Sequence, residues 1–114
     1  LIVATPTGST GYSLSCGGPI IMPGTDNFVI TPIAQHNLNV RPIVIDSNSI
    51  IKLKVEDRDK LALVTLDSCS RAFDSSVELT IKKADFTINL IEPEGNTFSS
   101  TIRHKLMWGL DKRN

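Results

Sequence analysis

Short runs in which apolar and polar residues alternate dominate the second half of this chain. Three such runs lie at residues 51–55, 77–81 and 86–90. A spacing of two puts every second side chain on the same face, which is typical of strands with one buried face. Leu61–Leu66 is more uniformly apolar, and polar turn formers such as Asp74-Ser-Ser76 separate the runs. Short strands at short intervals predict an all-β fold, a sandwich of mostly antiparallel strands.

The first half of the chain is less regular. Residues 1–4 form an apolar run that predicts a strand, and a loop rich in Gly, Ser and Thr follows it. We expect a short helix at about residues 12–16, and a further strand near residues 28–31. Prolines at positions 19, 23, 32 and 42 keep such strands short or at sheet edges. Near the C-terminus, Phe98, Ile102 and Leu106 recur at a spacing of four, which predicts a C-terminal helix after a turn at residues 92–95.

Composition excludes several classes of protein. The 114 residues are 40% apolar, which suffices for one core, and we expect one domain over residues 1–114. Twelve basic and twelve acidic residues cancel, so the composition indicates no surface for nucleic acid. No apolar stretch reaches the ~18–20 residues of a membrane span. Cys16 and Cys69 fit no metal-ligand spacing and are too few for a disulfide scaffold. We expect a soluble, cytoplasmic protein, and the apolar start without Met indicates a portion of a longer chain.

The loop Thr5-Pro-Thr-Gly-Ser-Thr-Gly-Tyr12 leaves a predicted strand and enters a predicted helix. Its two glycines let a ligand approach the backbone, while Thr7, Ser9 and Thr10 add hydroxyls to the N–H groups near the helix start. Such a place suits phosphate, ribose hydroxyls or the edge of a base, and the ring of Tyr12 can pack on a nucleotide. The same hydroxyls also suit helix capping. The spacing matches neither the dinucleotide fingerprint nor the phosphate loop, so both interpretations stay open.

Three blocks of sequence resemble the NAD kinase family. Residues 5–19 resemble its motif Thr-Pro-Thr-Gly-Ser-Thr-Ala-Tyr, which is followed by a Ser and then Gly-Gly-Pro. Residues 30–45 resemble Thr-Pro-Ile-Ala-Pro-His-Asn/Ser-Leu with a later Arg-Pro, and residues 101–109 resemble the closing Leu-Arg-x-Lys-Leu-x-Trp helix. The blocks occur in family order and span nearly the whole chain. Two departures are Gly11, where Ala is commoner, and Gln35, where Pro is usual.

The resemblance implies an activity and a division of labour. The family transfers the γ-phosphate of ATP, with a divalent metal such as Mg²⁺, to the 2′-hydroxyl of the adenosine ribose of NAD, giving NADP. Its activating Asp lies in a Gly-Gly-Asp-Gly-Thr loop of an N-terminal, ATP-binding domain, and this motif is absent from the present sequence. The chain would be the C-terminal domain of the NAD kinase/diacylglycerol kinase-like fold. It would supply the NAD side of the cleft and the contacts of a homodimer or homotetramer. It would hold no catalytic residue and no metal ligand, and it would be inactive alone.

Carried over position by position, the resemblance implies NAD contacts for five residues of the loop and helix. Thr10 and Gly11 would meet the adenine edge, with Thr7 nearby. Tyr12 would lie along the dinucleotide, and Ser15 would face the base from the helix.

Two later residues, His36 and Asp67, are also implied as NAD contacts. Each has a simpler alternative, since His36 lies in a Pro-bounded loop where it can be a structural hydrogen-bonding group, and Asp67 can be a turn residue. Arg41 suits a pyrophosphate by its guanidinium geometry or is a solvated surface group.

Two rival functions remain on sequence grounds. A lipid kinase of the diacylglycerol or sphingosine type shares the architecture but has a different loop motif. A non-catalytic nucleotide sensor is the other. A Gly-Gly-Asp-Gly-Thr stretch upstream would favour the kinase over the sensor.

Overall fold

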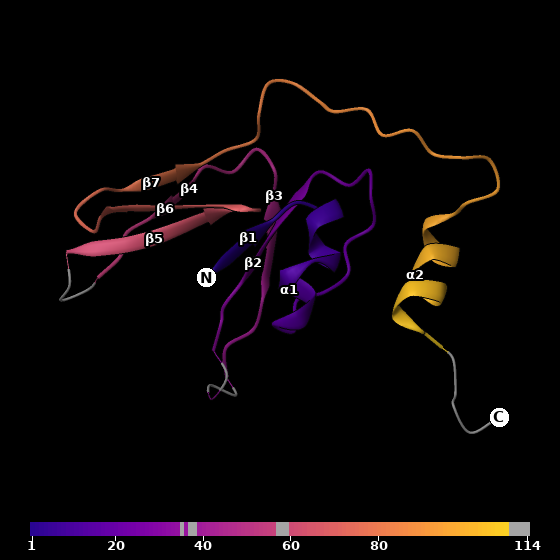
Figure 1. The fold of residues 1–114 in the computed structure, drawn as a ribbon, viewed down its shortest axis with the longest axis horizontal. Coiled ribbons are helices and arrows are strands. Elements are labelled where there is room, and N and C mark those ends of the chain that lie inside the picture. Colours follow the sequence, from indigo (N-terminus) through magenta and orange to yellow (C-terminus); the bar gives the residue numbers. More distant parts are fainter. Residues whose placement is uncertain (35, 37–38, 57–59, 110–114) are drawn as a thin grey trace. The chain divides into compact units, whose positions relative to one another are not determined.

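The computed structural model describes residues 1–34, 36, 39–56 and 60–109. They divide into two compact units, and each unit is described by itself. The first consists of Leu1–Asp46 with Asp85–Asn114, and the second of Ser47–Ala84. Figure 1 follows the order of helices and strands along the chain.

A three-stranded antiparallel sheet forms the centre of the first unit. Its strands are β1 (Ile2–Ala4), β2 (Asn27–Thr31) and β3 (Ile43–Asp46), and β2 lies between the other two. Val29 of β2 is opposite Ala4 on one side and Val44 on the other, and only 1% of Val29 is exposed. The core of this unit therefore lies on the middle strand.

Prolines limit this sheet as predicted. Pro32 directly follows the last residue of β2, and Pro42 directly precedes the first residue of β3. Proline has no N–H to donate to a neighbouring strand, so strand pairing stops beside it. The predicted strands near residues 1–4 and 28–31 are confirmed. The sequence pattern did not predict β3, because Ile-Val-Ile-Asp shows no alternation of apolar and polar residues.

Two short helical turns follow β1. The 3₁₀ turn η1 covers Thr7–Thr10 and the helix α1 covers Tyr12–Ser15. Figure 1 shows α1 beside the β1–β2 part of the sheet. The helix predicted here is confirmed, and it ends one residue early. Gly17 adopts a φ of +83° and donates its N–H to the carbonyl of Leu14, which closes the helix in the way that a left-handed glycine does.

The second unit consists of two antiparallel strand pairs. The strands β4 (Ile51–Leu53) and β7 (Leu79–Ile81) form one pair, and β5 (Leu61–Leu66) and β6 (Cys69–Asp74) form the other. Ile51 is the buried apolar residue of β4, at 7% exposure. These strands confirm the prediction for residues 61–66 with the same bounds and those for residues 51–55 and 77–81 with shorter bounds. Strand β6 was not predicted, since Cys-Ser-Arg-Ala-Phe-Asp lacks the alternating pattern.

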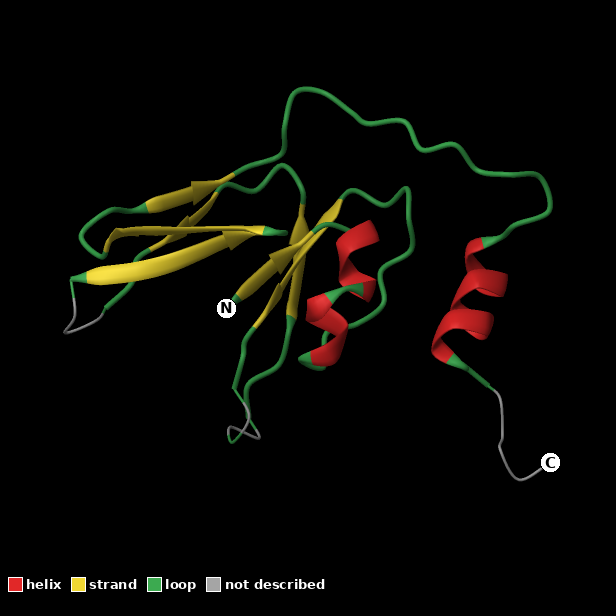
Figure 2. Cartoon of the chain, viewed as in Figure 1, coloured by secondary structure: helices red, strands yellow, loops and turns green. Residues whose placement is uncertain are grey.

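The strand predicted at residues 86–90 is wrong. This segment contains no strand, and Figure 2 draws the chain between β7 and α2 as loop. Phe86, Ile88 and Leu90 are 73%, 80% and 78% exposed. Alternation gives a segment one apolar face, but a strand also needs a hydrogen-bonding neighbour. None of the described residues pairs with this segment.

The predicted C-terminal helix is confirmed as α2 (Phe98–Leu106). Thr97 begins it with a capping box, because its Oγ1 accepts the N–H of Ser100 and the Ser100 Oγ accepts the N–H of Thr97, both at 3.1 Å. The predicted turn before it is present, with the N–H of Asn96 donated to the carbonyl of Pro93. No helix in the described part of the chain has the length and apolar character needed to cross a membrane.

The carboxyl of Asp74, at the end of β6, makes the stability of the turn that follows depend on pH. The hydroxyl of Ser76 and then its backbone N–H, 2.9 Å from Asp74 Oδ1, hold the pKa of the Asp74 carboxyl below its usual range. Since the folded-state pKa is lowered, the turn is stabilised above the ordinary Asp pKa, and this contribution is lost as pH falls through the folded value. We expect Ser76→Ala to raise the Asp74 pKa towards the ordinary value. Titration of the carboxyl carbon by NMR measures this, and an unchanged midpoint would contradict the assignment.

Candidate functional site

The segment η1–α1 presents five predicted site residues in one continuous stretch of chain. Thr7, Gly11, Tyr12 and Ser15 are exposed, and Thr10 is half-buried. Tyr12 keeps 63% of its surface accessible although it lies in a helix packed beside a sheet. The stretch therefore offers hydroxyls, a glycine backbone and an aromatic ring to a ligand on the same short segment.

The helix-capping interpretation holds only for Thr5, whose Oγ1 accepts the N–H of Gly8 in η1 at 3.3 Å. Pro6 is the N-cap of η1 and Gly11 is the N-cap of α1, and neither cap makes a side-chain hydrogen bond. Thr10 Oγ1 donates to the carbonyl of Thr7 at 3.3 Å, which is a long bond for a hydroxyl donor. Thr7 Oγ1 is likewise 3.3 Å from Thr5 Oγ1. Both threonine hydroxyls are thus only weakly engaged within the protein.

Ser9 corrects one part of the sequence prediction. We expected its hydroxyl to face a ligand with those of Thr7 and Thr10, but Ser9 is fully buried. Its Oγ donates to the carbonyl of Pro6 at 2.6 Å and accepts the N–H of Ile21 at 2.9 Å. A buried hydroxyl that both donates and accepts is held in place, because losing either partner leaves a buried polar group unsatisfied. Ser9 therefore ties η1 to the segment that follows α1.

A second buried hydroxyl ties α1 to the sheet. Ser13 Oγ lies 2.8 Å from Thr31 Oγ1 of β2, and the two residues are 1% and 0% exposed. Gly18 packs against this pair, and its N–H donates to the Ser13 carbonyl at 2.8 Å. Neither Ser13 nor Thr31 was singled out by the sequence pattern. The Gly-Gly-Pro run was the available signal, because a glycine often marks a close backbone approach.

The remaining predicted residues lie on other segments. His36 is exposed in the stretch that joins β2 and β3, and Gln35 beside it lies outside the described residues. Asp67 lies in the second unit, in the two-residue turn between β5 and β6, where it adopts a φ of 50°. Asp tolerates this left-handed conformation, so the turn alone accounts for its presence there. The NAD contacts of His36 and Asp67 stay predictions.

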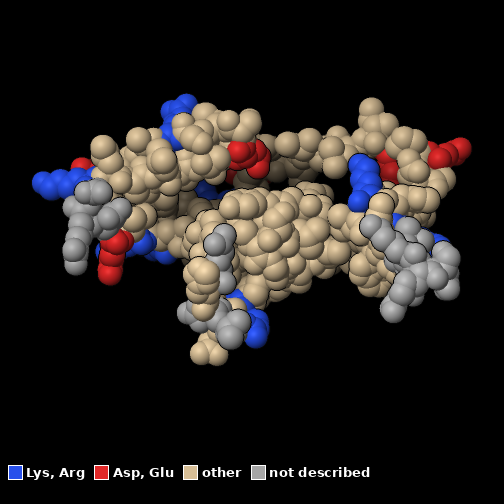
Figure 3. Space-filling view, turned by 60° about the horizontal axis from the view of Figure 1, so that its bottom comes forward, with Lys and Arg blue, Asp and Glu red and all other residues tan. Residues whose placement is uncertain are grey.

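Ionisable side chains in the described part of the chain were the candidates for a metal centre. Among the described residues, no group of three or more His, Cys, Asp or Glu side chains lies close enough to hold a metal ion. These residues therefore do not fit a metal site of their own, and we assign no step to one. Figure 3 shows acidic and basic side chains interspersed on the face in view.

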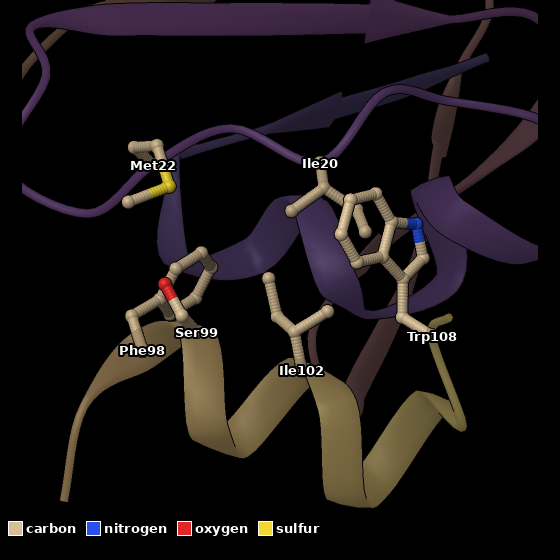
Figure 4. A pocket seen from close by; sticks show the side chains of 6 residues that line it. All are labelled: Ile20, Met22, Phe98, Ser99, Ile102 and Trp108. Atoms are coloured by element: carbon tan, nitrogen blue, oxygen red, sulfur yellow. The ribbon is translucent and has the colours of Figure 1, made fainter. Parts of the chain in front are cut away.

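An apolar pocket of about 450 Å³ lies elsewhere in the first unit. Figure 4 shows Ile20 and Met22, from the segment after α1, facing side chains of α2 and the indole of Trp108. The full lining consists of Ile20, Met22, Phe98, Ser99, Ile102 and Trp108. It includes no charged group and none of the predicted site residues, so it does not suit a charged dinucleotide. The stretch η1–α1 remains the candidate site.

Sequence comparisons place this chain in a family. The sequence profile described as ATP-NAD kinase C-terminal domain matches residues 1–92. The NAD kinase of Christiangramia forsetii is 58% identical over 114 residues, and that of Porphyromonas gingivalis is 47% identical over 109 residues. These matches cover 100% and 96% of this chain but only 39% and 38% of the relatives. The chain thus spans about two fifths of the length of these curated relatives.

A solved structure agrees with the sequence matches. The crystal structure of yeast NADH kinase complexed with NADH superposes with a TM-score of 0.76 at 26% identity. The match covers 96% of this chain and 35% of the yeast chain. Together with the profile match, this likeness confirms the predicted fold class of short, mostly antiparallel strands with few short helices. The chain belongs to the NAD kinase family, and residues 1–92 match its C-terminal domain.

Proposed function

We propose that these 114 residues form the C-terminal, NAD-binding domain of an NAD kinase. The enzyme would transfer the γ-phosphate of ATP to the 2′-hydroxyl of the adenosine ribose of NAD. The observation that carries the proposal is the stretch η1–α1, where Thr10, Gly11, Tyr12 and Ser15 remain accessible while buried Ser9 fixes the loop from behind. The names of the relatives and the NADH bound to the yeast protein support it.

Holding the adenosine still is a catalytic contribution in this reaction. A ribose hydroxyl is a weak nucleophile, so it must be held in line with the phosphorus atom that it attacks. Positioning of this kind supplies up to about 7–11 kcal/mol of the barrier in well-oriented reactions. Thr10 and Gly11 would meet the adenine edge, Tyr12 would pack along the dinucleotide, and Ser15 would face the base. Thr7, the first residue of η1, would add an exposed hydroxyl to this NAD-binding surface.

The phosphoryl-transfer groups belong elsewhere in the proposed enzyme. ATP would bind the N-terminal domain, which would also supply the Asp that activates the hydroxyl. A divalent metal such as Mg²⁺, when bound with ATP, neutralises charge on the phosphates. His36 and Asp67 would contact NAD from outside η1–α1. A homodimer or homotetramer in the cytoplasm completes the proposal.

We expect the isolated 114-residue chain to form no NADP from NAD, ATP and Mg²⁺, because positioning of NAD alone supplies neither the binding site for ATP nor the activating group. The complete protein, meaning the full-length chain that carries these residues, should form NADP under the same conditions. A coupled assay with an NADP-specific dehydrogenase measures both. NADP formation by the isolated chain would contradict the proposed division of labour, and an inactive complete protein would refute the kinase assignment.

A further inference from the structure

We infer that Ser13 and Thr31 are positioning residues for NAD, and that their hydroxyl pair sets the direction in which α1 presents Tyr12 and Ser15. This inference rests on the proposed function and extends it to two buried residues behind the exposed face of α1. It follows from three features of the described structure: the shortness of α1, the geometry of the buried pair, and the close approach of Gly18.

Helix α1 cannot hold its orientation by itself. It has four residues, whereas isolated helices shorter than ~12–15 residues are marginal even in favourable sequences. Its orientation must therefore come from contacts with the rest of the fold. Ser13 is the buried residue of α1, and Thr31 is a fully buried residue of the middle strand β2. The bond of 2.8 Å between their hydroxyls joins the helix to the most enclosed part of the sheet.

The rotation of α1 about its axis decides where Tyr12 and Ser15 point. Residues three apart lie on the same face of a helix, so Tyr12 and Ser15 are neighbours on one side. Both are exposed, while Ser13 is directed into the protein. Because all three belong to one rigid turn, fixing the hydroxyl of Ser13 on Thr31 also fixes the exposed face.

Gly18 packs against the hydroxyl pair of Ser13 and Thr31. A Cβ at position 18 would lie 2.8 Å from the Ser13 carbonyl oxygen and 2.9 Å from Thr31 Oγ1, and closer still to Ser13 Oγ. Its N–H also donates to the Ser13 carbonyl. The backbone after α1 therefore packs directly on the hydroxyl pair and leaves it no room to move. Ser13, Gly18 and Thr31 come from three separate segments that meet at one point behind the proposed ligand face.

The test compares variants of the complete protein by steady-state kinetics and thermal unfolding. Ser13→Ala and Thr31→Val remove one hydroxyl each, and Thr31→Ser keeps the hydroxyl while removing a methyl group. Ile51→Val, in the core of the second unit, is the control for a loss of stability alone. We expect Ser13→Ala and Thr31→Val to raise the KM for NAD about tenfold, which corresponds to ~1.4 kcal/mol. The KM for ATP should stay within about twofold, and any change in kcat should be a decrease, because positioning of the adenosine also contributes to the chemical step.

The conservative variant separates a positioning role from a structural one. Thr31→Ser should keep the KM for NAD near that of the unmodified protein, because its hydroxyl still reaches Ser13. Ile51→Val should lower the Tm and leave the KM for NAD unchanged. Equal KM values for Thr31→Val and Thr31→Ser would overturn the inference, and these two variants decide the matter even where Ser13→Ala does not fold. An unmodified protein that forms no NADP would refute the proposed function instead.

Discussion

Replacing Tyr12 by Ala in the complete protein is expected to raise the KM for NAD about 10- to 100-fold while the KM for ATP stays within about twofold. The reason is the loss of the aromatic surface on which the dinucleotide packs, and stacking of one base on an aromatic ring contributes ~1–3 kcal/mol. Tyr12 is 63% exposed, so its ring contributes little to the core. The substitution should therefore change the Tm only slightly, as is usual for exposed positions.

Tyr12→Phe is the matched control for this substitution. It keeps the ring and removes only the hydroxyl, so the KM for NAD should stay within about threefold if packing dominates, a difference below ~1 kcal/mol. Initial-rate measurements with NAD varied at saturating ATP, and then the reverse, give both constants for each variant. Unchanged KM and kcat for NAD in Tyr12→Ala would count against placing NAD on η1–α1.

Among the substitutions proposed for this protein, Gly18→Ala should lower the free energy of unfolding the most. The added Cβ would come within 3 Å of a backbone carbonyl and of two hydroxyls that are themselves buried. None of these atoms is the free end of a flexible side chain, so the backbone after α1 must move or the Ser13–Thr31 bond must break. Overpacking of this kind costs ~1–3 kcal/mol, and a stranded buried hydroxyl adds to it. We expect a loss of about 3 kcal/mol in the free energy of unfolding.

Gly8→Ala, in η1, provides the comparison within the same unit. A Cβ at position 8 would lie 3.4 Å from Thr5 Oγ1 and 3.6 Å from Ala4 Cβ, which are ordinary contacts. Its effect on stability should stay within about 0.5 kcal/mol. Urea unfolding of the complete protein, with the midpoint and slope fitted for each variant, measures both. Equal stability for the two variants would show that the segment after α1 is not tightly packed on Ser13.

The local features of the fold were predictable from the sequence. Alternation located β4 and β7, the uniformly apolar run located β5, and the spacing of Phe98, Ile102 and Leu106 located α2. These signals are local because they arise from the period of each element. Strand β6 escaped prediction because its residues form a strand only by pairing with β5, residue by residue from Leu61 to Leu66. Residues 86–90 show the converse, since their apolar alternation lacks a pairing strand among the described residues.

The location of the candidate site was predictable from the sequence, but the burial of individual side chains within it was not. The Gly, Ser and Thr loop identified η1–α1, and the structure leaves Thr10, Gly11 and Tyr12 accessible there, at least in part. The sequence could not distinguish Ser9 from its neighbouring threonines. Whether a hydroxyl faces solvent or the core depends on what packs behind it, and the partner of Ser9 is the N–H of Ile21, twelve residues away. Tertiary contacts of this kind decide which hydroxyl side chains are buried, and they cannot be inferred from the composition of the loop.

The most direct measurement is a crystal structure of the complete protein with NAD bound. We expect the adenosine of NAD to lie against η1–α1, with the adenine edge within hydrogen-bonding distance of Thr10 and Gly11 and the ring of Tyr12 packed on the dinucleotide. The 2′-hydroxyl of the adenosine ribose should face the proposed ATP-binding domain. Electron density for NAD at this stretch would support the account. Density for NAD in the apolar pocket beside α2, or anywhere that leaves Tyr12 untouched, would contradict it.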